Sequence, residues 1–353
     1  MANHHITPFF LEKKDVVLIK PSKPTSPCVL SLSTIDNDHN LELITQTIYV
    51  YQASVNSTNG SDPACVIEEA LSKVLVYYYP LAGKLKRNSD GKLRINSNED
   101  GVPFLEATAN CELSSLRSLD GIDVETAEQF VFDWPCDGDG GYHPLVLQLT
   151  KFSCGGFTIG MGLSHSVCDG FGAALFFRAI AELASGKSEP SVKPVWERER
   201  QVVKPSQDPI QFVVVKASLA ASPYLPTNEL FRECFNVSCE SIRKLKMVLM
   251  KESENEVLNE NLSFTTLEVL GAYVWRSRAM ALKLNPDGKT HFCLALARGD
   301  KKLIETTFAC WVLWLDSSMR DGVRICVSLP RAAMAKIEKW MLLRLEMKMI
   351  PRI

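Results

Sequence analysis

The run His165-Ser166-Val167-Cys168-Asp169-Gly170, in mid-chain, is where residue types and spacing best suggest chemistry. A neutral imidazole has an ordinary pKa of about 6.5, so it can take a proton from a hydroxyl or an amine that attacks a carbonyl carbon. The same imidazole can then return the proton to a leaving thiolate. General-base catalysis by His165 therefore needs no separate nucleophile.

The spacing His-x-x-x-Asp is a weak signal alone, because six histidines and an aspartate frequency of about one in twenty give roughly 0.3 matches by chance. A histidine buried for packing, or bound to a backbone carbonyl, is the alternative interpretation. Serine-hydrolase chemistry would need Gly-x-Ser-x-Gly, whereas residues 162–166 read Gly-Leu-Ser-His-Ser. Adjacent strand residues point to opposite faces, so Ser164 should not pair with His165. Cys168 is a further candidate nucleophile, but nothing in its surroundings marks a thiol of lowered pKa.

Asp169 has three interpretations: it could orient the histidine, act as a second acid, or serve the backbone. Gly170 beside it indicates a tight bend in which the aspartate side chain caps backbone amides at the start of a helix. We therefore expect Asp169 and Gly170 to support the loop that carries His165.

Two strands and a helix are expected to position this run. Residues 145–152 and 157–165 are typical of strands joined by a glycine turn. After Gly170 the apolar residues step by three and four until Gly186, which should end a helix. His165 is thus expected at a junction between a strand and a helix, where a rigid sheet can hold a reactive group at its edge.

The remaining pattern predicts further strands and helices in two domains. A polar, proline-bearing stretch at 187–210 reads as a linker between a domain at 1–186 and a domain at 211–353. Strands are expected at 15–20, 46–51, 91–96, 231–237 and 322–330, and helices at 63–76, 239–250, 263–282 and 332–347.

Composition limits the class of protein. A chain of 353 residues with 46% hydrophobic residues is long enough for about two domains of roughly 150 residues, each with its own buried core. A formal net charge of -2 offers no field to hold nucleic acid. No run of about 18 apolar residues and no secretory signal is visible, which predicts a cytoplasmic protein without a membrane span. Eleven cysteines without Cys-x-x-Cys pairs predict reduced, buried thiols and no metal site.

With its surroundings, the run at 165–170 resembles the His-x-x-x-Asp-Gly signature of the plant BAHD acyl-CoA-dependent acyltransferases. Residues 79–85, Tyr-Pro-Leu-Ala-Gly-Lys-Leu, resemble that family's Tyr-Pro-Leu-Ala-Gly-Arg/Lys stretch. Residues 32–36 resemble its early Leu-Ser-x-x-Asp, and residues 265–276 the helix that opens its second domain. The similarity covers residues 10–297 and is strongest to the branch of spermidine hydroxycinnamoyl transferases and taxane-type acyltransferases.

The resemblance implies a mixed α/β (α+β) fold of two chloramphenicol-acetyltransferase-like domains, each a mixed sheet backed by helices, with a solvent channel between them. It implies a monomer that binds no resident cofactor and uses acyl-CoA as co-substrate. The acyl group, hydroxycinnamoyl, benzoyl or acetyl, would pass to a small-molecule alcohol or amine of plant specialised metabolism.

Several residue roles also follow from the resemblance. His165 would be the general base, Asp169 would point away from the substrate, and Arg298 is a candidate for the arginine that pairs with this aspartate in the family. The acceptor pocket is expected near Ser33, Thr34 and Asp36.

One departure from the family is large, because the chain contains no Asp-Phe-Gly-Trp-Gly. Similarity fades after Ala297 and resumes near Leu315, which predicts a second domain truncated by roughly a fifth of the family length. The run at 308–315 either covers the exposed sheet or is the junction product of a truncated gene model or splice form, and we favour the second interpretation. The competing functions are a catalytically impaired paralogue or gene-model fragment that acts at most as a binding protein, and a hydrolase, which the absent nucleophile elbow disfavours.

Overall fold

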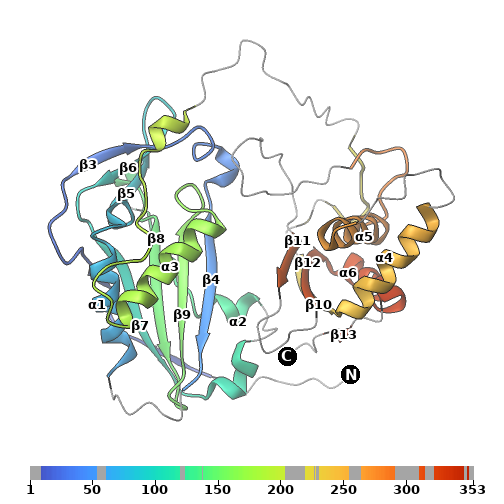
Figure 1. Cartoon of the computed structure of the whole chain (residues 1–353), viewed down its shortest axis with the longest axis horizontal. Coiled ribbons are helices and arrows are strands. Elements are labelled where there is room, and N and C mark those ends of the chain that lie inside the picture. Colours follow the sequence, from blue (N-terminus) through green and yellow to red (C-terminus); the bar gives the residue numbers. More distant parts are fainter. Residues whose placement is uncertain are drawn as a thin grey trace. The chain divides into compact units, whose positions relative to one another are not determined.

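The computed structural model divides the chain into two compact units, residues 1–209 with Ile353 and residues 210–352 (Figure 1). The domain limits at 186 and 210 stay predictions. The residues that the structure describes are 9–53, 61–119, 124–136, 138–202, 219–225, 227, 230–253, 264–290, 310–314, 322–345 and 348–349.

A mixed six-stranded sheet forms the frame of the first unit. Strands β7 and β8 run parallel, and the other paired strands run antiparallel. The order is β1 (Leu11–Lys13), β7 (Val102–Ala109), β8 (Leu145–Lys151), β9 (Phe157–Ser164) and β4 (Ile44–Tyr51), with β2 (Val17–Ile19) also on β7. The sheet thus places the end of β9 next to the beginning of β4, where Ser164 lies opposite Ile44.

The hairpin of β8 and β9 leads directly into helix α3 (Gly170–Ala184). Gly155 turns the hairpin with a φ of 79°, a left-handed conformation that glycine adopts without strain. Gly186, with a φ of 94°, follows the helix end. The predicted strand, strand and helix around His165 are confirmed.

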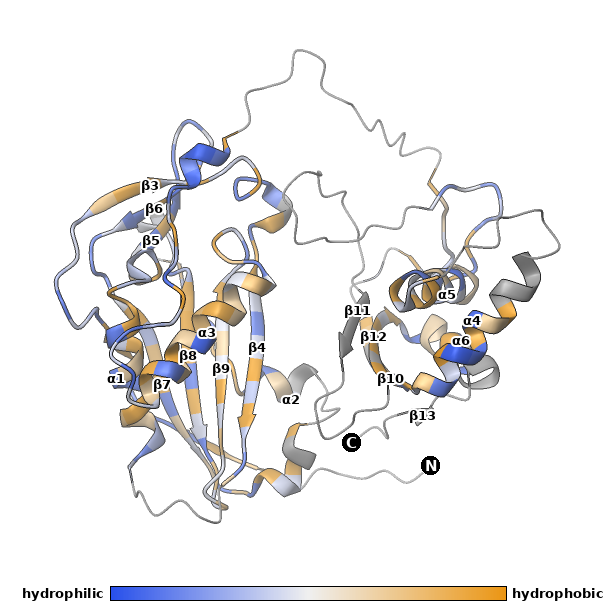
Figure 2. Cartoon of the chain, in the orientation of Figure 1, coloured by the Kyte–Doolittle hydropathy of each residue, from blue (hydrophilic) through white to orange (hydrophobic). Residues whose placement is uncertain are grey.

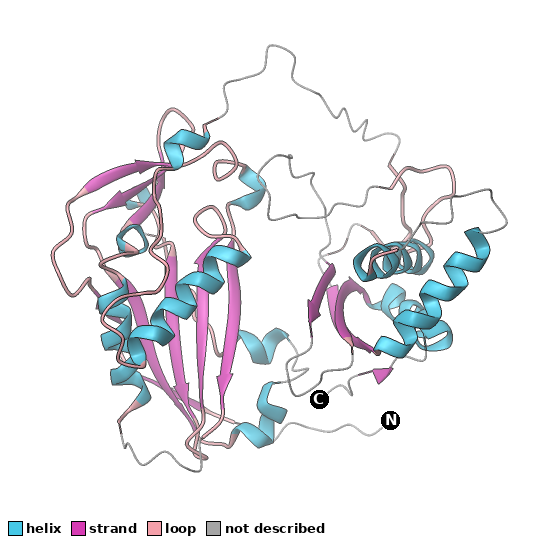
Figure 3. Cartoon of the chain, in the orientation of Figure 1, coloured by secondary structure: helices cyan, strands magenta, loops and turns pink. Residues whose placement is uncertain are grey.

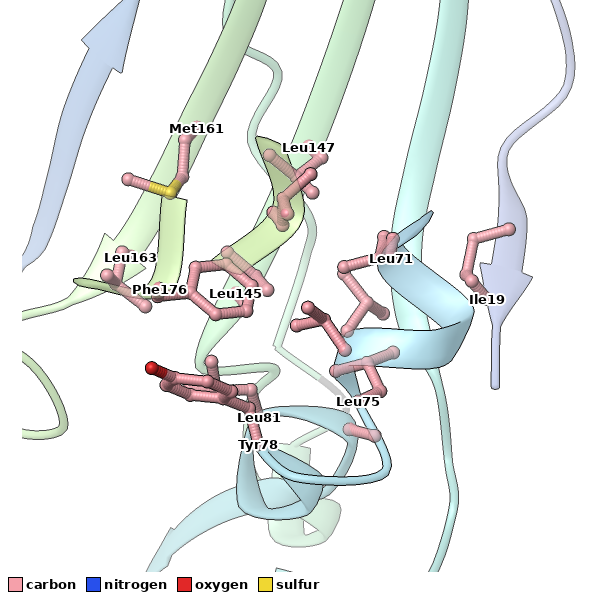
Figure 4. Packing of buried hydrophobic residues seen from close by; sticks show 14 of the residues in the cluster. Ile19, Leu71, Leu75, Tyr78, Leu81, Leu145, Leu147, Met161, Leu163 and Phe176 are labelled. Atoms are coloured by element: carbon pink, nitrogen blue, oxygen red, sulfur yellow. The ribbon is translucent and has the colours of Figure 1, made fainter. Parts of the chain in front are cut away.

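Helix α1 (Pro63–Val74) and α3 pack together over the sheet. Asp62 caps α1 by accepting a hydrogen bond from the Ala64 amide, and Pro63 occupies the first turn, where its missing N–H costs nothing. Figure 2 shows apolar stretches along both helices, interrupted by hydrophilic residues. The core that they enclose includes Leu71, Leu75, Leu145, Leu147, Met161, Leu163 and Phe176 (Figure 4).

A second cluster of buried residues belongs to the same unit. It contains Leu116, Phe130 and Phe152, with Ile48 of β4 packed against it. The short elements here are η3 (Leu113–Leu119) and α2 (Val124–Glu128). Six consecutive residues of β8 are buried, among them Gln148 and Thr150, and the Gln148 amide donates to the Thr150 hydroxyl at 3.1 Å.

A three-stranded antiparallel sheet completes the first unit, in the order β3 (Cys28–Ser31), β6 (Leu93–Ser97) and β5 (Lys84–Arg87). A turn at Asp90-Gly91 joins β5 to β6, with Gly91 at a φ of 74°. Three-residue to seven-residue 3₁₀ segments connect these strands and helices: η1 (His39–Leu41), η2 (Tyr79–Ala82), η4 (Gly138–Gly140) and η5 (Arg198–Gln201), besides η3.

The second unit has an antiparallel sheet flanked by helices (Figure 3). The strand order is β11 (Cys310–Trp314), β12 (Val323–Pro330), β10 (Leu230–Val237) and β13 (Lys348–Met349), and the helices are α4 (Cys239–Ser253), α5 (Thr266–Ala281) and α6 (Arg331–Leu345). Phe235, Leu270 and Ile325 are fully buried in its core. Of the run at 308–315, residues 310–314 form β11 and pair with β12, while the choice between the two interpretations of this run stays open.

Two helices of this unit begin at a serine or threonine that caps them. The Ser241 amide donates to Ser238 Oγ at 3.1 Å, so Ser238 caps α4. Thr265 and Glu268 form a reciprocal capping box at the start of α5. Among the described residues, no helix is both long and apolar enough to cross a membrane.

Candidate active site

The loop between β9 and α3 carries His165 and is fixed through its backbone. The His165 amide donates to the Leu43 carbonyl at 2.9 Å, which extends the pairing of β9 with β4 by one residue. The amides of Val167 and Cys168 both donate to the Ser164 carbonyl, at 3.0 and 3.1 Å. The chain thus turns sharply within three residues of the strand end.

The His165 side chain is half-buried. Its Nδ1 is buried without a hydrogen-bond partner among the residues that the structure describes. The alternative interpretation had a backbone carbonyl binding the histidine, and no carbonyl of the described residues binds Nδ1. Because Nδ1 is buried, Nε2 is the ring nitrogen that a bound molecule could meet.

Asp169 is the N-cap of α3. Its backbone is extended, with φ of -77° and ψ of -179°, and its Oδ1 accepts a hydrogen bond from the Gly172 amide at 2.8 Å. The predicted cap is present, and this oxygen is engaged by the helix and not by His165. Gly170 lies in the first turn with a φ outside the left-handed region, and a Cβ there would meet no atom within 4 Å. The bend therefore does not depend on glycine at this position.

The hydroxyl and thiol groups on either side of His165 are buried or largely buried. Ser164 is fully buried, and Ser166 Oγ donates to the Leu41 carbonyl at 3.2 Å in a buried setting. Burial raises the pKa of the Cys168 thiol to about 11, although the nearby Arg198 charge acts in the opposite direction. A nucleophilic thiolate at Cys168 is therefore disfavoured.

The turn at residues 33–36, the predicted acceptor region, is internally bonded. The Ser33 amide donates to Asp36 Oδ2 at 3.0 Å, and the Asp36 amide donates to Ser33 Oγ at 3.2 Å. Ser33 is buried, whereas Thr34 is exposed. An acceptor pocket at Ser33, Thr34 and Asp36 stays a prediction.

Arg198 links this turn to the histidine loop, and the sequence patterns did not indicate it. One guanidinium nitrogen, Nη1, donates to Asp36 Oδ2 at 2.9 Å, and the other, Nη2, donates to the Val167 carbonyl. Arg198 lies in the stretch read as a linker. The signal available there was Trp196, a large aromatic residue two positions before an arginine in a segment rich in charged residues and proline.

Two other expectations concern the same site. Arg298, the candidate partner of Asp169, lies outside the described residues. Within the described ranges, no group of three or more His, Cys, Asp or Glu residues could hold a metal ion.

The sequence matches known acyltransferases. The model of the Transferase family matches residues 9–299. A spermidine coumaroyl-CoA acyltransferase of Arabidopsis thaliana is 47% identical over 312 residues, which are 86% of this chain and 66% of the relative. A 3'-N-debenzoyl-2'-deoxytaxol N-benzoyltransferase of Taxus canadensis is 38% identical, with 79% of this chain and 60% of the relative covered. The chain thus spans slightly under two thirds of the length of these relatives.

The fold matches solved structures of low sequence identity. Vinorine synthase superposes with a TM-score of 0.65 at 20% identity, over 95% of this chain and 98% of that chain. TRI101 of F. sporotrichioides, solved with coenzyme A and T-2, superposes with a TM-score of 0.51 at 19% identity, over 72% of this chain and 60% of that chain. The mixed α/β fold class is confirmed, and the extent of the family match shows that the chain belongs to the Transferase family, the BAHD acyltransferases that its sequence resembles.

Proposed function

We propose that this chain is an acyl-CoA-dependent acyltransferase in which His165 is the general base. The observation that carries the proposal is the state of this side chain. Its backbone is fixed at the end of β9 by the Leu43 carbonyl, while its Nδ1 has no hydrogen-bond partner in the described part of the chain. Because Nδ1 is buried, Nε2 is the nitrogen that would take the proton, and the fixed backbone holds the ring at the end of the strand.

The reaction requires one proton to move twice. The acceptor nitrogen or oxygen forms a bond to the thioester carbonyl carbon while the imidazole takes the acceptor's proton. The C–S bond then breaks, and the imidazolium gives the proton to the departing thiolate of coenzyme A. No covalent enzyme intermediate is needed, in agreement with the buried Ser164 and with the raised pKa of Cys168.

The proposed substrates are a hydroxycinnamoyl-CoA donor and an amine of a polyamine such as spermidine. This choice rests on two relatives, named spermidine coumaroyl-CoA and spermidine sinapoyl-CoA acyltransferase, which are 47% and 45% identical to this chain. From the family resemblance we also propose that the chain acts as a monomer and uses coenzyme A only as part of the co-substrate, and from the sequence patterns that it acts in the cytoplasm.

The test follows free thiol when the purified chain is mixed with coumaroyl-CoA and spermidine. We expect thiol release that depends on spermidine, and a kcat that is lower by roughly 10²–10⁴-fold in His165→Ala, because the proton transfer is lost. His39→Ala is the matched control, since that side chain is 79% exposed in η1, and it should keep the original kcat. Thiol release that is unchanged in His165→Ala would contradict the assignment of the base, and release without spermidine would indicate a hydrolase.

A second candidate is a catalytically impaired relative that binds acyl-CoA without turning it over. The observation in its favour is the missing Asp-Phe-Gly-Trp-Gly of the family. It predicts binding of coenzyme A with no thiol release from any acceptor.

A further inference from the structure

Arg198 joins two loops that lie far apart in the sequence. Its two terminal nitrogens bind different acceptors, Asp36 Oδ2 at 2.9 Å and the Val167 carbonyl. The side chains of Arg198 and Asp36 are only 23% and 18% exposed, so solvent screens this ion pair less than an ordinary surface pair. The guanidinium thereby holds the turn at 33–36 and the histidine loop at a fixed separation.

The guanidinium is itself held by aromatic residues. It lies over the Trp196 ring, 5.4 Å from the ring centroid. Trp196 Nε1 donates to the Tyr77 carbonyl at 3.1 Å, and the ring makes edge contacts with Tyr78 and Tyr79. Arg198 is therefore anchored, through Trp196, to the segment that follows α1, and these contacts restrict the movement of its guanidinium group.

Apart from the turn hydrogen bonds to the Ser164 carbonyl and the burial of Val167, the histidine loop is bound to other segments mainly in its first half. The amide of His165 binds the Leu43 carbonyl, and Ser166 Oγ binds the Leu41 carbonyl. Val167, two residues after the histidine, turns its carbonyl to Arg198. The contact with Arg198 thus restrains the second half of the loop, before Asp169 begins the helix.

We propose that Arg198 is a positioning residue, which fixes the loop of His165 by binding the Val167 carbonyl and the Asp36 carboxylate together. Its effect on turnover rests on the proposed function of His165, whereas its effect on loop structure does not. A lysine cannot replace it fully, because an ammonium group lacks the planar fork that reaches two acceptors at once.

Cys168 offers a direct measure of the loop that does not need catalysis. Its thiol lies in the loop itself, and burial is the largest cause of its raised pKa, ahead of the opposing Arg198 charge. If Arg198→Gln only removed that charge, the pKa of Cys168 would rise further and alkylation would slow. If the loop is released, relief of burial outweighs the lost charge and alkylation becomes faster. Loss of the charge alone and release of the loop therefore change the alkylation rate of Cys168 in opposite directions.

The experiment measures iodoacetamide labelling of each cysteine in the folded full chain by peptide mass spectrometry. We expect Arg198→Gln to raise the labelling rate of Cys168 by about fivefold or more, as local opening requires, with no change at the half-buried Cys111. Arg200→Gln is the matched control, because that side chain is 74% exposed and, among the described residues, its ion pair is with Glu197, at 2.7 Å. It should leave Cys168 unchanged.

The kinetic arm uses coumaroyl-CoA and spermidine. We expect Arg198→Gln to lower kcat by roughly 10- to 100-fold, the effect of a base displaced by about 1 Å, with KM for the acyl-CoA within about twofold. Arg198→Lys should recover part of kcat, and Asp36→Asn should lower kcat less than Arg198→Gln, since it leaves the contact with Val167.

Several outcomes would overturn the assignment. A Cys168 labelling rate that is unchanged or lower in Arg198→Gln means that the loop did not move. An equal rise at Cys111 means general loosening and not release of one loop, which also counts against a local role. If faster labelling of Cys168 occurs with kcat unchanged, Arg198 does not position the base. If the original chain releases no thiol at all, the proposed function fails, while the labelling result still decides the structural role of Arg198.

Discussion

Asp169 shows at the scale of one residue why a carboxylate beside a candidate base need not take part in proton transfer. Its Oδ1 accepts from the Gly172 amide at 2.8 Å, and its backbone carbonyl accepts from the Ala173 amide at the same distance. Both contacts belong to the first turn of α3, where the helix dipole also favours a negative charge. The carboxylate therefore stabilises the helix that follows the histidine loop.

The cap at Asp169 can be tested by two substitutions. Asp169→Ala should lower the free energy of unfolding by about 1 kcal/mol, because the Gly172 amide loses its partner. Asp169→Asn should lose only a few tenths of that amount, since an amide oxygen caps nearly as well and only the charge is removed. Urea unfolding of the full chain measures both. Equal losses in the two variants would show that the charge matters more than the cap.

Residues that share one short run could be predicted from the sequence, and their distant partners could not. His165 and Asp169 are four positions apart, so one short sequence motif contains both. Arg198 binds Asp36 across 162 positions, and only folding reveals that they meet. The arginine was further hidden because its neighbours Glu197, Glu199 and Arg200 make the segment look like a solvated linker.

Strand β9 shows, at the scale of an element, why one position must be glycine: the backbone of a neighbouring segment lies too close to residue 160 for any side chain. A Cβ on Gly160 would lie 1.9 Å from the Phe130 carbonyl oxygen and 2.8 Å from Val131 Cγ2. Real side-chain atoms do not come so close to backbone, so the segment at 130–131 can cover the sheet only if residue 160 has no side chain. This glycine lies in the strand that ends at the histidine loop.

We expect Gly160→Ala to destabilise the first unit by about 1–3 kcal/mol, because the backbone at Phe130 must move to admit the methyl group. Gly170→Ala is the control, since its Cβ would meet open space within 4 Å and its φ is not left-handed. It should be neutral or slightly stabilising. Thermal unfolding followed by circular dichroism compares the two variants. A Gly160→Ala protein as stable as the Gly170→Ala protein would contradict the close approach.

Elements with a strong local signal, strands as well as helices, were predictable, whereas strand β7 was not. Helices α1, α3 and α5 have caps and apolar spacing within their own sequence. Strand β7 carries Pro103 and Glu106, which weaken any strand pattern. Its place in the sheet depends on parallel pairing with β8, and on Lys14 and Lys151, whose ammonium groups pair with the Glu106 carboxylate at 2.8 and 2.5 Å.

At the scale of the whole molecule, each unit has its own buried core. Leu71 and Phe176 belong to the core of the first unit, and Leu270 and Ile325 to that of the second. The chain covers 66% and 65% of its two spermidine acyltransferase relatives, and it lacks the family's Asp-Phe-Gly-Trp-Gly. Binding of coenzyme A and turnover are therefore separate questions for this chain.

Coenzyme A itself can separate these questions by its effect on stability. A ligand that binds only the folded chain stabilises it by about 2.7 kcal/mol at 100 times its Kd. We expect coenzyme A to raise the Tm of the original chain and of His165→Ala equally, because the imidazole transfers a proton and is not needed to hold the cosubstrate. Only the original chain should then release thiol from coumaroyl-CoA in the presence of spermidine.

The alternatives give different pairs of results. An equal rise in Tm with no thiol release from either protein would favour the catalytically impaired relative. No rise in Tm with either protein would contradict both functions, since each requires the acyl-CoA to bind. A rise in the original chain that is lost in His165→Ala would mean that the histidine contacts the cosubstrate, and the fall in kcat of that variant would then reflect binding as well as proton transfer.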